Sequence, residues 1–285
     1  MIIDVHKHVF RNKSVFFGNF LAEASRMRAT EVDLTTRYSD YRATARDVDL
    51  AICFGGKAKL AGLWVNDQDV ADYIKQDPAR LIGFLSLDPT QPRWEAELEY
   101  GHQELGLQGI KLMPMYAGFY PQEAKLNYMW SYAQKHGLPV LLHTGTTFVS
   151  QGWIETTLPR HIDVVARRFP EVRIIMAHLA HPYEGECVAV IRKHPHVYAD
   201  VSALFYRPWQ LFHSLMLVHE YGVWNKLLFG TDFPITTVDD SLAGLRGLAT
   251  IKIDRFSLPA DKIEEVIQRD ALPLLGLVHP KGESA

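Results

Sequence analysis

The stretch MIIDVHKH (residues 1–8) decides between the fold classes open to this chain. Its apolar half predicts a short buried strand, and its polar half places two histidines and a lysine directly after that strand. An open, doubly wound parallel sheet is expected to carry a glycine-rich turn at this point. Because His6, Lys7 and His8 stand there instead, the stretch favours a closed barrel.

The rest of the chain repeats the same alternation of apolar runs and longer amphipathic stretches. Runs nearly continuous in Val, Ile, Leu and Phe are typical of parallel strands buried on both faces. We count eight such runs, at residues 2–5, 48–53, 81–87, 109–113, 138–143, 172–178, 196–202 and 227–231. Helices are expected at residues 92–105, 123–136, 160–169, 183–193, 207–221 and 259–269. The sequence therefore predicts a single-domain α/β protein, a (β/α)₈ or TIM barrel over residues 1–285, with a doubly wound sheet as the alternative.

Length and composition agree with one enzyme-sized domain. The chain has 285 residues, and such a barrel needs about 250 or more. The net charge of -3 provides no basic field for nucleic acid or an anionic membrane. Cys53 and Cys187 form neither a disulfide framework nor a metal motif. We expect a cytoplasmic protein without a targeting segment or membrane span that acts on a small molecule, and a homodimer is left open.

Polar residues end several predicted strands, which is where barrel enzymes carry their active sites. His6 and His8 are two apart, so a strand presents both imidazoles on one face, here the barrel interior. His143 and His178 end the fifth and sixth strands, and Asp232 follows the eighth. Three histidines and one carboxylate that leave one position open are typical of a catalytic metal site.

Each of these residues also has a plainer interpretation when it is taken alone. A histidine at a strand end can cap the following loop, and two histidines at a strand end can occur without any ligand. Asp232 precedes Phe233-Pro234, so it also fits a turn or a helix N-cap. The set as a whole is harder to explain by packing, because a buried histidine cluster without a metal leaves polar groups that need partners.

The motifs and their order resemble the amidohydrolase superfamily, and in particular the branch that contains aminocarboxymuconate-semialdehyde decarboxylase. The matching pieces are DVHKH (4–8), RLIGFLSLDP (80–89), ELGLQGIKLMPMYAGFYP (104–121), HGLPVLLHTG (136–145), FPEVRIIMAH (169–178), HPHVYADVS (194–202) and LLFGTDFP (227–234). The resemblance implies a (β/α)₈ barrel that holds one divalent metal, usually zinc, with manganese as an alternative. It assigns the metal ligands to His6, His8, His143 and Asp232. It also implies that His178 faces a metal-bound water, which makes His178 and Asp232 the catalytic pair.

Two positions depart from that pattern or leave it open. Family members often have glycines soon after the sixth-strand histidine, whereas this chain has Leu179-Ala180-His181-Pro182, which puts the shape of the pocket there in doubt. Lys111 ends the fourth strand, and in some branches a lysine there is carbamylated and bridges two metals. In this branch one metal is usual, so Lys111 is interpreted as a contact to a ligand or to a substrate carboxylate, or as plain structure.

The same ligands serve two reactions, so they do not choose between them. We expect a metal-dependent hydrolase in which water attacks an amide, ester or lactone of a small, ring-containing organic acid. The alternative is metal-dependent, non-oxidative decarboxylation of an aromatic or unsaturated acid, which needs a cation for the leaving carboxylate. The candidate cations are Lys7, Lys57, Lys111 and Arg207. A metal-free lactone hydrolase or a non-enzymatic binding protein on the same barrel is a further alternative.

Aromatic residues in two loops are expected to shape the substrate pocket. The loop at residues 9–28 carries Phe10, Phe16, Phe17 and Phe20. The loop after the fourth strand carries Tyr116 and Phe119, which together with Lys111 are the predicted substrate-binding residues. Such a lining suits a planar carbon skeleton, although the aromatics could equally pack the loops down.

Overall fold

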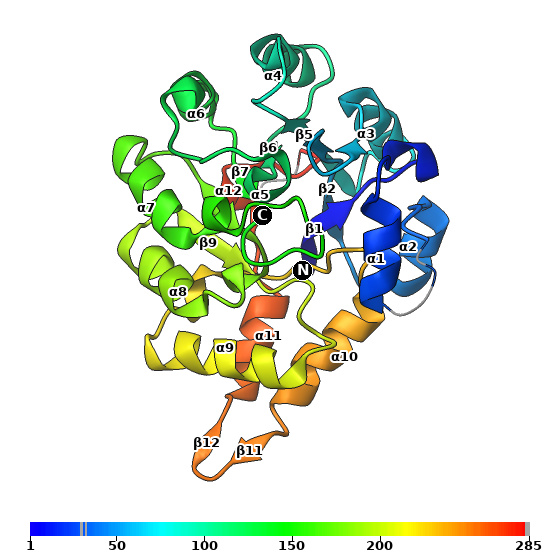
Figure 1. Ribbon diagram of the computed structural model, residues 1–285. Coiled ribbons are helices and arrows are strands. Elements are labelled where there is room, and N and C mark those ends of the chain that lie inside the picture. The colour runs from blue at the N-terminus through cyan, green and yellow to red at the C-terminus, as the bar shows by residue number, and fades with distance from the viewer. Residues whose placement is uncertain (29–30, 32, 283–285) are drawn as a thin grey trace.

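Eight parallel strands form a ring in the computed structural model, which describes residues 1–28, 31 and 33–282 (Figure 1). In order around the ring the strands are β1 (Ile3–His8), β2 (Leu50–Phe54), β5 (Leu81–Leu87), β6 (Ile110–Leu112), β7 (Val140–Leu142), β8 (Ile174–Met176), β9 (Val197–Asp200) and β10 (Leu227–Leu228). They correspond to the eight predicted runs. The predicted (β/α)₈ barrel is therefore confirmed.

Helices cover the outside of the ring (Figure 1). The six predicted helices are present as α4 (Trp94–Gln103), α6 (Asn127–His136), α7 (Pro159–Arg168), α8 (Glu184–Lys193), α9 (Pro208–Glu220) and α11 (Ala260–Ile267). The described residues also form α-helices that were not predicted, namely α1 (Phe20–Arg28), α2 (Tyr38–Thr44), α3 (Asp67–Ile74), α5 (Pro114–Ala117), α10 (Val238–Leu248) and α12 (Leu272–Leu275). The loop expected at residues 9–28 thus ends in a helix.

An extra residue in β1 turns the two site histidines into the ring. Three residues of β1 span the distance that two residues of β2 cover, which is the mark of a β-bulge. Val5 packs in the apolar cluster inside the ring, and strict alternation would then send His6 to the outer face. The bulge keeps His6 and His8 inside, where each ring lies 5.0 Å from the ring of Phe54.

The ring closes between β1 and the segment that follows the short β10. The backbone N–H of Asp232 donates to the carbonyl of His6 at 2.8 Å, and that of His8 donates to the carbonyl of Phe233 at 2.9 Å. Lys7 and Phe233 also form an isolated parallel bridge. The seam of the barrel therefore brings residues from the two ends of the chain side by side.

Two apolar clusters hold the strands in place. One fills the inside of the ring and includes Leu272 and Leu275 of α12, and the other lies between the strands and the outer helices. None of the described helices is long and apolar enough to cross a membrane.

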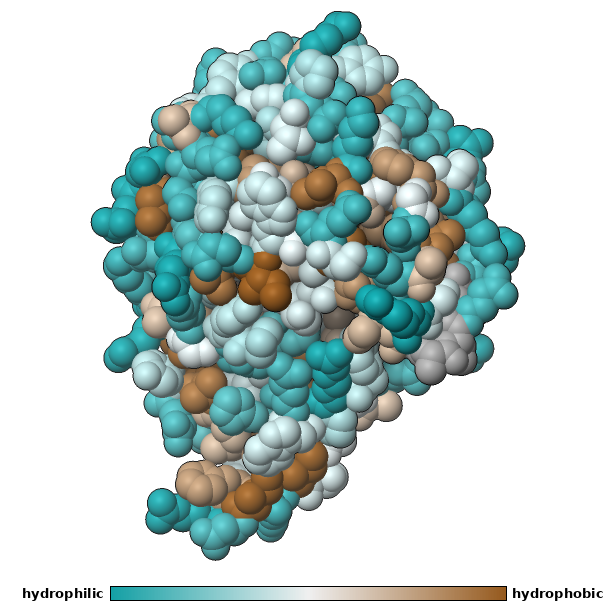
Figure 2. Space-filling model, viewed as in Figure 1, coloured by the Kyte–Doolittle hydropathy of each residue, from teal (hydrophilic) through white to brown (hydrophobic). Residues whose placement is uncertain are grey.

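A small hairpin stands out from the barrel beside α9 (Figure 1). It consists of β11 (Lys252–Ile253) and β12 (Phe256–Ser257). Figure 2 shows apolar side chains gathered over this region, where Trp209, Ile253 and Phe256 are exposed. A second short hairpin, β3 (Lys57–Ala58) and β4 (Leu63–Trp64), follows β2.

Candidate metal centre

His6, His8 and Asp232 meet at the carboxyl end of the barrel. Oδ1 of Asp232 lies 3.2 Å from Nε2 of His6 and 3.0 Å from Nε2 of His8. Two bonds of about 2.1 Å to one ion, at the angles of common coordination geometries, set their donor atoms roughly 3.0–3.5 Å apart. The spacing of these two nitrogens and one oxygen therefore fits a single divalent ion, and nitrogen with carboxylate oxygen is a donor set that zinc and manganese accept.

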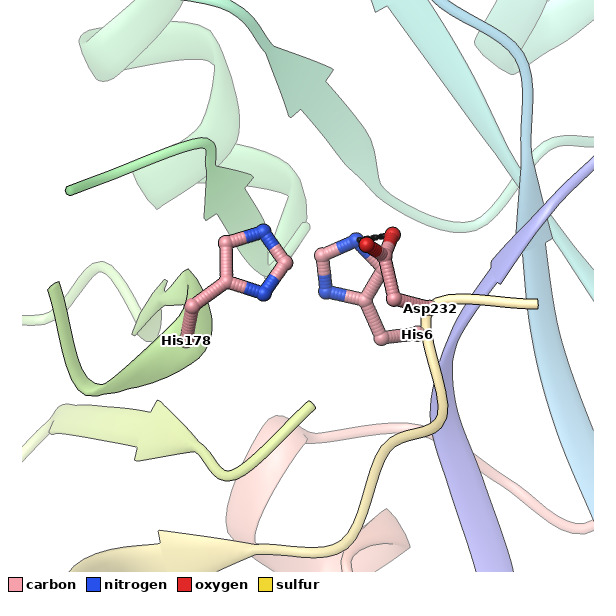
Figure 3. Close-up of side chains that lie close together, drawn as sticks. All are labelled: His6, His178 and Asp232. Carbon is pink, nitrogen blue, oxygen red and sulfur yellow. Dashed lines mark ion pairs between the residues drawn. The ribbon is translucent and has the colours of Figure 1, made fainter. Parts of the chain in front are cut away.

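His178 lies against the same group. Its ring centroid is 4.8 Å from that of His6, and ligand atoms of His6, His178 and Asp232 all lie within 4.8 Å of one another. Figure 3 shows the His178 ring pointing toward His6 and Asp232. His178 comes from the turn after β8, whereas the other two residues come from the barrel seam. The two sides of the site are thus supplied by different strands.

His143, another predicted ligand, contacts the ring of His178. Its centroid is 5.2 Å from that of His178, and its Nε2 lies 3.0 Å from the carbonyl oxygen of Thr146. Because a carbonyl only accepts, this Nε2 carries the hydrogen and Nδ1 is the nitrogen left for an ion. The compact group found among the described residues consists of His6, His178 and Asp232 and contains neither His8 nor His143, so ligation by these two histidines stays a prediction.

Burial sets the charge states at this centre. Burial lowers the pKa of His8 and of His178 to about 4, so both imidazoles are neutral at pH 7. Burial alone would raise the pKa of Asp232, but hydrogen bonds from His6 and His8 outweigh it and hold that pKa well below its usual value. Neutral imidazole and ionised carboxylate are the forms that bind metal ions, and His8 and Asp232 are in those forms. The contacts of His6 with Asp200 and Asp232 outweigh burial and raise the pKa of His6 above its usual value.

Asp200, which the sequence analysis left without a role, supports both sides of the site. It ends β9 and is fully buried. Its Oδ2 accepts from Nδ1 of His6 at 2.9 Å, and its Oδ1 accepts from the backbone N–H of His178 at 2.9 Å. The first bond commits Nδ1 of His6 to Asp200, so Nε2 is the nitrogen that remains to bind an ion. The one sequence signal was an aspartate at the end of the seventh apolar run.

A cavity of about 250 Å³ opens onto the centre. It is lined by Ala24, Met27, Leu34, Tyr116, His143, Thr146, Thr147, Phe148, His178, His181, Ala203, Tyr206, Arg207, Asp232 and Ile235. Among the predicted substrate-binding residues, Tyr116 lies in this wall and its ring is 4.8 Å from that of His143. Phe119 is fully buried and is not part of this lining.

The loop after β1 shapes the cavity with side chains other than the expected ones. Ala24 and Met27 of α1 line it. Phe10, Phe16 and Phe20 instead stack on one another, with ring centroids 4.9 and 5.0 Å apart. For these three phenylalanines the packing interpretation holds.

The four candidate cations differ in their relation to the site: Lys7 and Lys57 lie away from it, Lys111 contacts His6 without lining the cavity, and Arg207 lines the cavity. Lys7 is on the outer side of β1, where its Nζ lies 4.1 Å from the centre of the Tyr73 ring. Lys57 pairs with Asp67 at 2.6 Å and also with Glu97. Neither lysine lines the cavity among the described residues, so neither is placed to seat a carboxylate there.

The other two cations, Lys111 and Arg207, adjoin the site. Nζ of Lys111 is fully buried and lies 3.5 Å from Nε2 of His6, and burial lowers its pKa to about 8. Arg207 lies in the cavity wall. The arginine ion pairs within the described residues lie elsewhere, at Arg11, Arg37, Arg80, Arg160, Arg167 and Arg246.

The protein is thus a barrel in which histidines at strand ends and an aspartate at the seam form a candidate metal centre. The family model described as amidohydrolase matches residues 3–275. The chain therefore belongs to the amidohydrolase family. No curated protein matches its sequence.

Solved structures with the same fold include both hydrolases and decarboxylases. An uncharacterised TIM-barrel protein of Bordetella bronchiseptica has 20% identity and a TM-score of 0.74, over 96% of this chain and 98% of that one. A probable 2-pyrone-4,6-dicarboxylic acid hydrolase of Acinetobacter baumannii, with citric acid bound, has 15% identity and a TM-score of 0.66, over 97% and 99%. A dihydroxybenzoic acid decarboxylase of a Polaromonas species, with manganese and 2-nitroresorcinol bound, has 16% identity and a TM-score of 0.65, over 96% of each chain. At these identities the likeness establishes the fold.

Proposed function

We propose that the protein is a metal-dependent hydrolase that acts on an amide, ester or lactone of a small organic acid. The observation that carries this proposal is the position of His178, a neutral imidazole in the cavity wall beside His6 and Asp232. A neutral imidazole at that place can accept a proton from an attacking water.

The two histidines in the cavity wall are neutral. Burial lowers the pKa of His178 and of His181 to about 4, so neither imidazole carries an extra proton at pH 7. Hydrolysis begins by removing a proton from water, which neutral His178 can do.

The roles of the chain's own residues follow from their positions. His6, His8 and Asp232 would hold the ion, with His143 proposed as a further ligand and zinc as the expected metal, manganese being the alternative. When bound, a divalent ion supplies a Lewis acid that polarises a carbonyl oxygen and lowers the pKa of water to about 7. His178 takes the proton of the attacking water and returns it to the leaving group.

Arg207 supports an acidic substrate. Arg207 lies in the cavity wall, and the central carbon of its guanidinium is 5.4 Å from the centre of the Tyr206 ring. A guanidinium binds a carboxylate through two parallel hydrogen bonds. Tyr116 and Phe148 add aromatic wall, which suits a flat carbon skeleton. We therefore propose a ring-containing carboxylic acid, with its carboxylate on Arg207.

Non-oxidative decarboxylation of a hydroxylated aromatic acid is the second candidate, and Lys111 favours it. The Nζ of Lys111 lies 3.5 Å from His6 and 4.5 Å from the centre of the Phe54 ring. A cation buried beside the metal ligands could seat a carboxylate that is about to leave, and a pKa of about 8 lets it carry a proton. In the hydrolase proposal the same lysine contacts the substrate's carbonyl or carboxylate oxygen.

The experiment compares both reactions on one preparation. Protein loaded with zinc or with manganese is assayed with 2-pyrone-4,6-dicarboxylic acid and aryl lactones for ring opening, and with dihydroxybenzoic acids for release of carbon dioxide. We expect ring opening, about one metal ion per chain, and loss of activity on chelation. Release of carbon dioxide without any hydrolysis would overturn the proposal in favour of the second candidate.

A matched pair of arginine variants tests the acidic substrate. Arg207→Gln should raise KM for a carboxylate-bearing substrate by roughly tenfold or more, because a charge-assisted bond is lost. Arg37→Gln, at an exposed arginine paired with Asp40 on α2, should leave KM unchanged. An equal KM in both variants would remove Arg207 from substrate binding.

A further inference from the structure

The environment of the His178 ring fixes which of its two nitrogens carries the hydrogen. Nδ1 lies 2.7 Å from the hydroxyl oxygen of Ser202 and 3.3 Å from the carbonyl oxygen of the same residue. Nε2 makes no hydrogen bond within the described part of the chain, and His178 lines the cavity. One nitrogen is therefore anchored to β9 and its extension, and the other is open toward the substrate.

The carbonyl of Ser202 gives the first indication of which ring nitrogen of His178 carries the hydrogen. A backbone carbonyl only accepts, so its approach to Nδ1 of His178 is favourable only when Nδ1 bears the hydrogen. The hydroxyl of Ser202 can donate or accept, so by itself it does not decide. Its polarity follows from what else it contacts.

Asp200 decides the polarity of that hydroxyl. Its Oδ1 accepts the backbone N–H groups of His178 and Ser202 at 2.9 and 3.0 Å and lies 2.5 Å from Oγ of Ser202. Its Oδ2 accepts from Nδ1 of His6. A carboxylate with this many donors around it is an acceptor only, so the one hydroxyl hydrogen of Ser202 points to Asp200. Oγ of Ser202 then offers only lone pairs to Nδ1 of His178.

We propose that Ser202 is a positioning residue that holds neutral His178 as the tautomer with hydrogen on Nδ1 and a bare Nε2 facing the cavity. The proposal deepens the hydrolase function, on which its catalytic consequence rests. Only an imidazole with a bare Nε2 can take a proton from water in the cavity. The opposite tautomer would present an N–H there and could not act as a base.

The tautomer itself is measured independently of any reaction. Protein labelled with ¹⁵N-histidine gives two-bond ¹H–¹⁵N correlations that distinguish a protonated from an unprotonated ring nitrogen, and the His178→Gln variant assigns the signal. In the wild type, without added metal, we expect Nδ1 protonated and Nε2 unprotonated. In Ser202→Ala the tautomer ratio should move toward hydrogen on Nε2 by roughly fivefold, since one neutral hydrogen bond is lost and the carbonyl of residue 202 remains.

Ser86→Ala is the matched control. Ser86 is also fully buried, near the carboxyl end of another strand of the ring, β5, but its hydroxyl has no hydrogen-bond partner among the described residues. Its removal should leave the signal of His178 and the turnover unchanged. Ser202→Ala should lower kcat by no more than the roughly fivefold change in the tautomer ratio, at constant KM and constant metal content, because the base is misprotonated in part of the population.

The outcomes separate this inference from the proposed function. A wild-type His178 with hydrogen on Nε2 overturns the inference even if Ser202→Ala does not fold. So does an unchanged tautomer ratio in a folded Ser202→Ala variant. If instead the tautomer is as expected but neither hydrolysis nor decarboxylation is found with any substrate, the positioning by Ser202 stands and the proposed function fails.

Discussion

β1 and the turn after β8 both direct a histidine into the site, but their backbones do so by different means. β1 uses one extra residue, and none of residues 3–8 has a left-handed backbone. The turn instead runs through three consecutive left-handed residues, His178, Leu179 and Ala180, with φ of 58°, 47° and 53°. Left-handed backbone costs a residue with a side chain roughly 1–2 kcal/mol.

The difference separates a half of the site that strand pairing turns inward from one whose backbone is strained. The bulge in β1 directs His6 and His8 inward by strand pairing, and Asp200 then accepts from Nδ1 of His6. The strained turn is held by Asp200, which accepts the N–H of His178, and by Ser202, which contacts its ring. We therefore expect the first half to govern metal binding and the second to govern proton transfer.

Asp232→Asn should have the largest effect, because Asp232 is the carboxylate of the metal-holding half. The substitution keeps the size but removes the charge that offsets the ion. We expect a folded protein that loses nearly all turnover. Its metal affinity should fall by more than about 100-fold, because loss of a residue that only hydrogen-bonds to a metal ligand already costs roughly 10–100-fold. Near-normal turnover after metal is supplied, with only a lower melting temperature, would make Asp232 a mere turn residue.

His178→Ala tests the other half. Turnover should fall by roughly 10²–10⁴ while the metal content stays near the wild-type value, since the lost group moves a proton and does not hold the ion. Elemental analysis and kcat on the same preparation decide. A variant purified without metal would make His178 a ligand and break the division between the halves.

Asp200→Asn should affect both metal binding and proton transfer, because Asp200 contacts both His6 and His178. The amide oxygen must stay on the two backbone N–H groups, so its NH₂ faces Nδ1 of His6 and forces that nitrogen to accept. The hydrogen of His6 then moves to Nε2, the proposed ligand atom. We expect metal affinity lower by roughly 10–100-fold, measured by competition with a chelator. Unaltered affinity would show that His6 does not depend on this carboxylate.

The stability of the turn half should depend on pH through His181. Burial lowers the pKa of this histidine to about 4 in the folded protein, from an ordinary value near 6.5. Between pH 6.5 and 4 the unfolded chain therefore binds more protons, so stability falls as the pH falls, by at most about 1.4 kcal/mol per pH unit. In His181→Gln the free energy of unfolding of metal-free protein should fall less steeply over this window. Parallel curves for the two proteins would contradict the assignment.

The smallest effect should come from glycine in the strained turn. Ala180→Gly loses a buried methyl but relieves left-handed backbone, so we expect its unfolding free energy to stay within about 1 kcal/mol of wild type. Ala177 is equally buried and is not left-handed, so Ala177→Gly should cost roughly 1–2 kcal/mol. Equal losses in urea unfolding would mean that the turn is not strained.

Much of this architecture could be predicted from the sequence, because parallel strands leave a short-range signal. Each apolar run is visible by itself, and the carboxyl ends of parallel strands meet at one end of a barrel, so His6, His8, His178 and Asp232 could be grouped. The family resemblance added their expected roles. Whether His143 joins them as a ligand rests on that resemblance.

What could not be predicted depends on contacts between distant residues or on irregular backbone. The role of Asp200 arises from its bond to His6, a residue 194 positions away. The directions of Lys7 and Lys111, one outward and one toward the site, depend on the bulge in β1 and on strand register, neither of which leaves a pattern in composition. The left-handed backbone at Leu179 and Ala180 had one sign in the sequence, namely that the glycines which family members often have after the sixth-strand histidine are absent here.

The seam of the barrel has a consequence for how the molecule folds. His8 and Asp232 belong to opposite ends of the chain, and the hydrogen bonds that close the ring run between the same two segments. An ion bound there ties the first strand to the last, so it can bind with full affinity only to a closed ring. Its binding free energy then adds to the global stability, by about 2.7 kcal/mol at a free concentration one hundred times Kd. The ion would thus stabilise the whole domain, and the concentration of free metal would set the fraction of folded protein as well as its turnover.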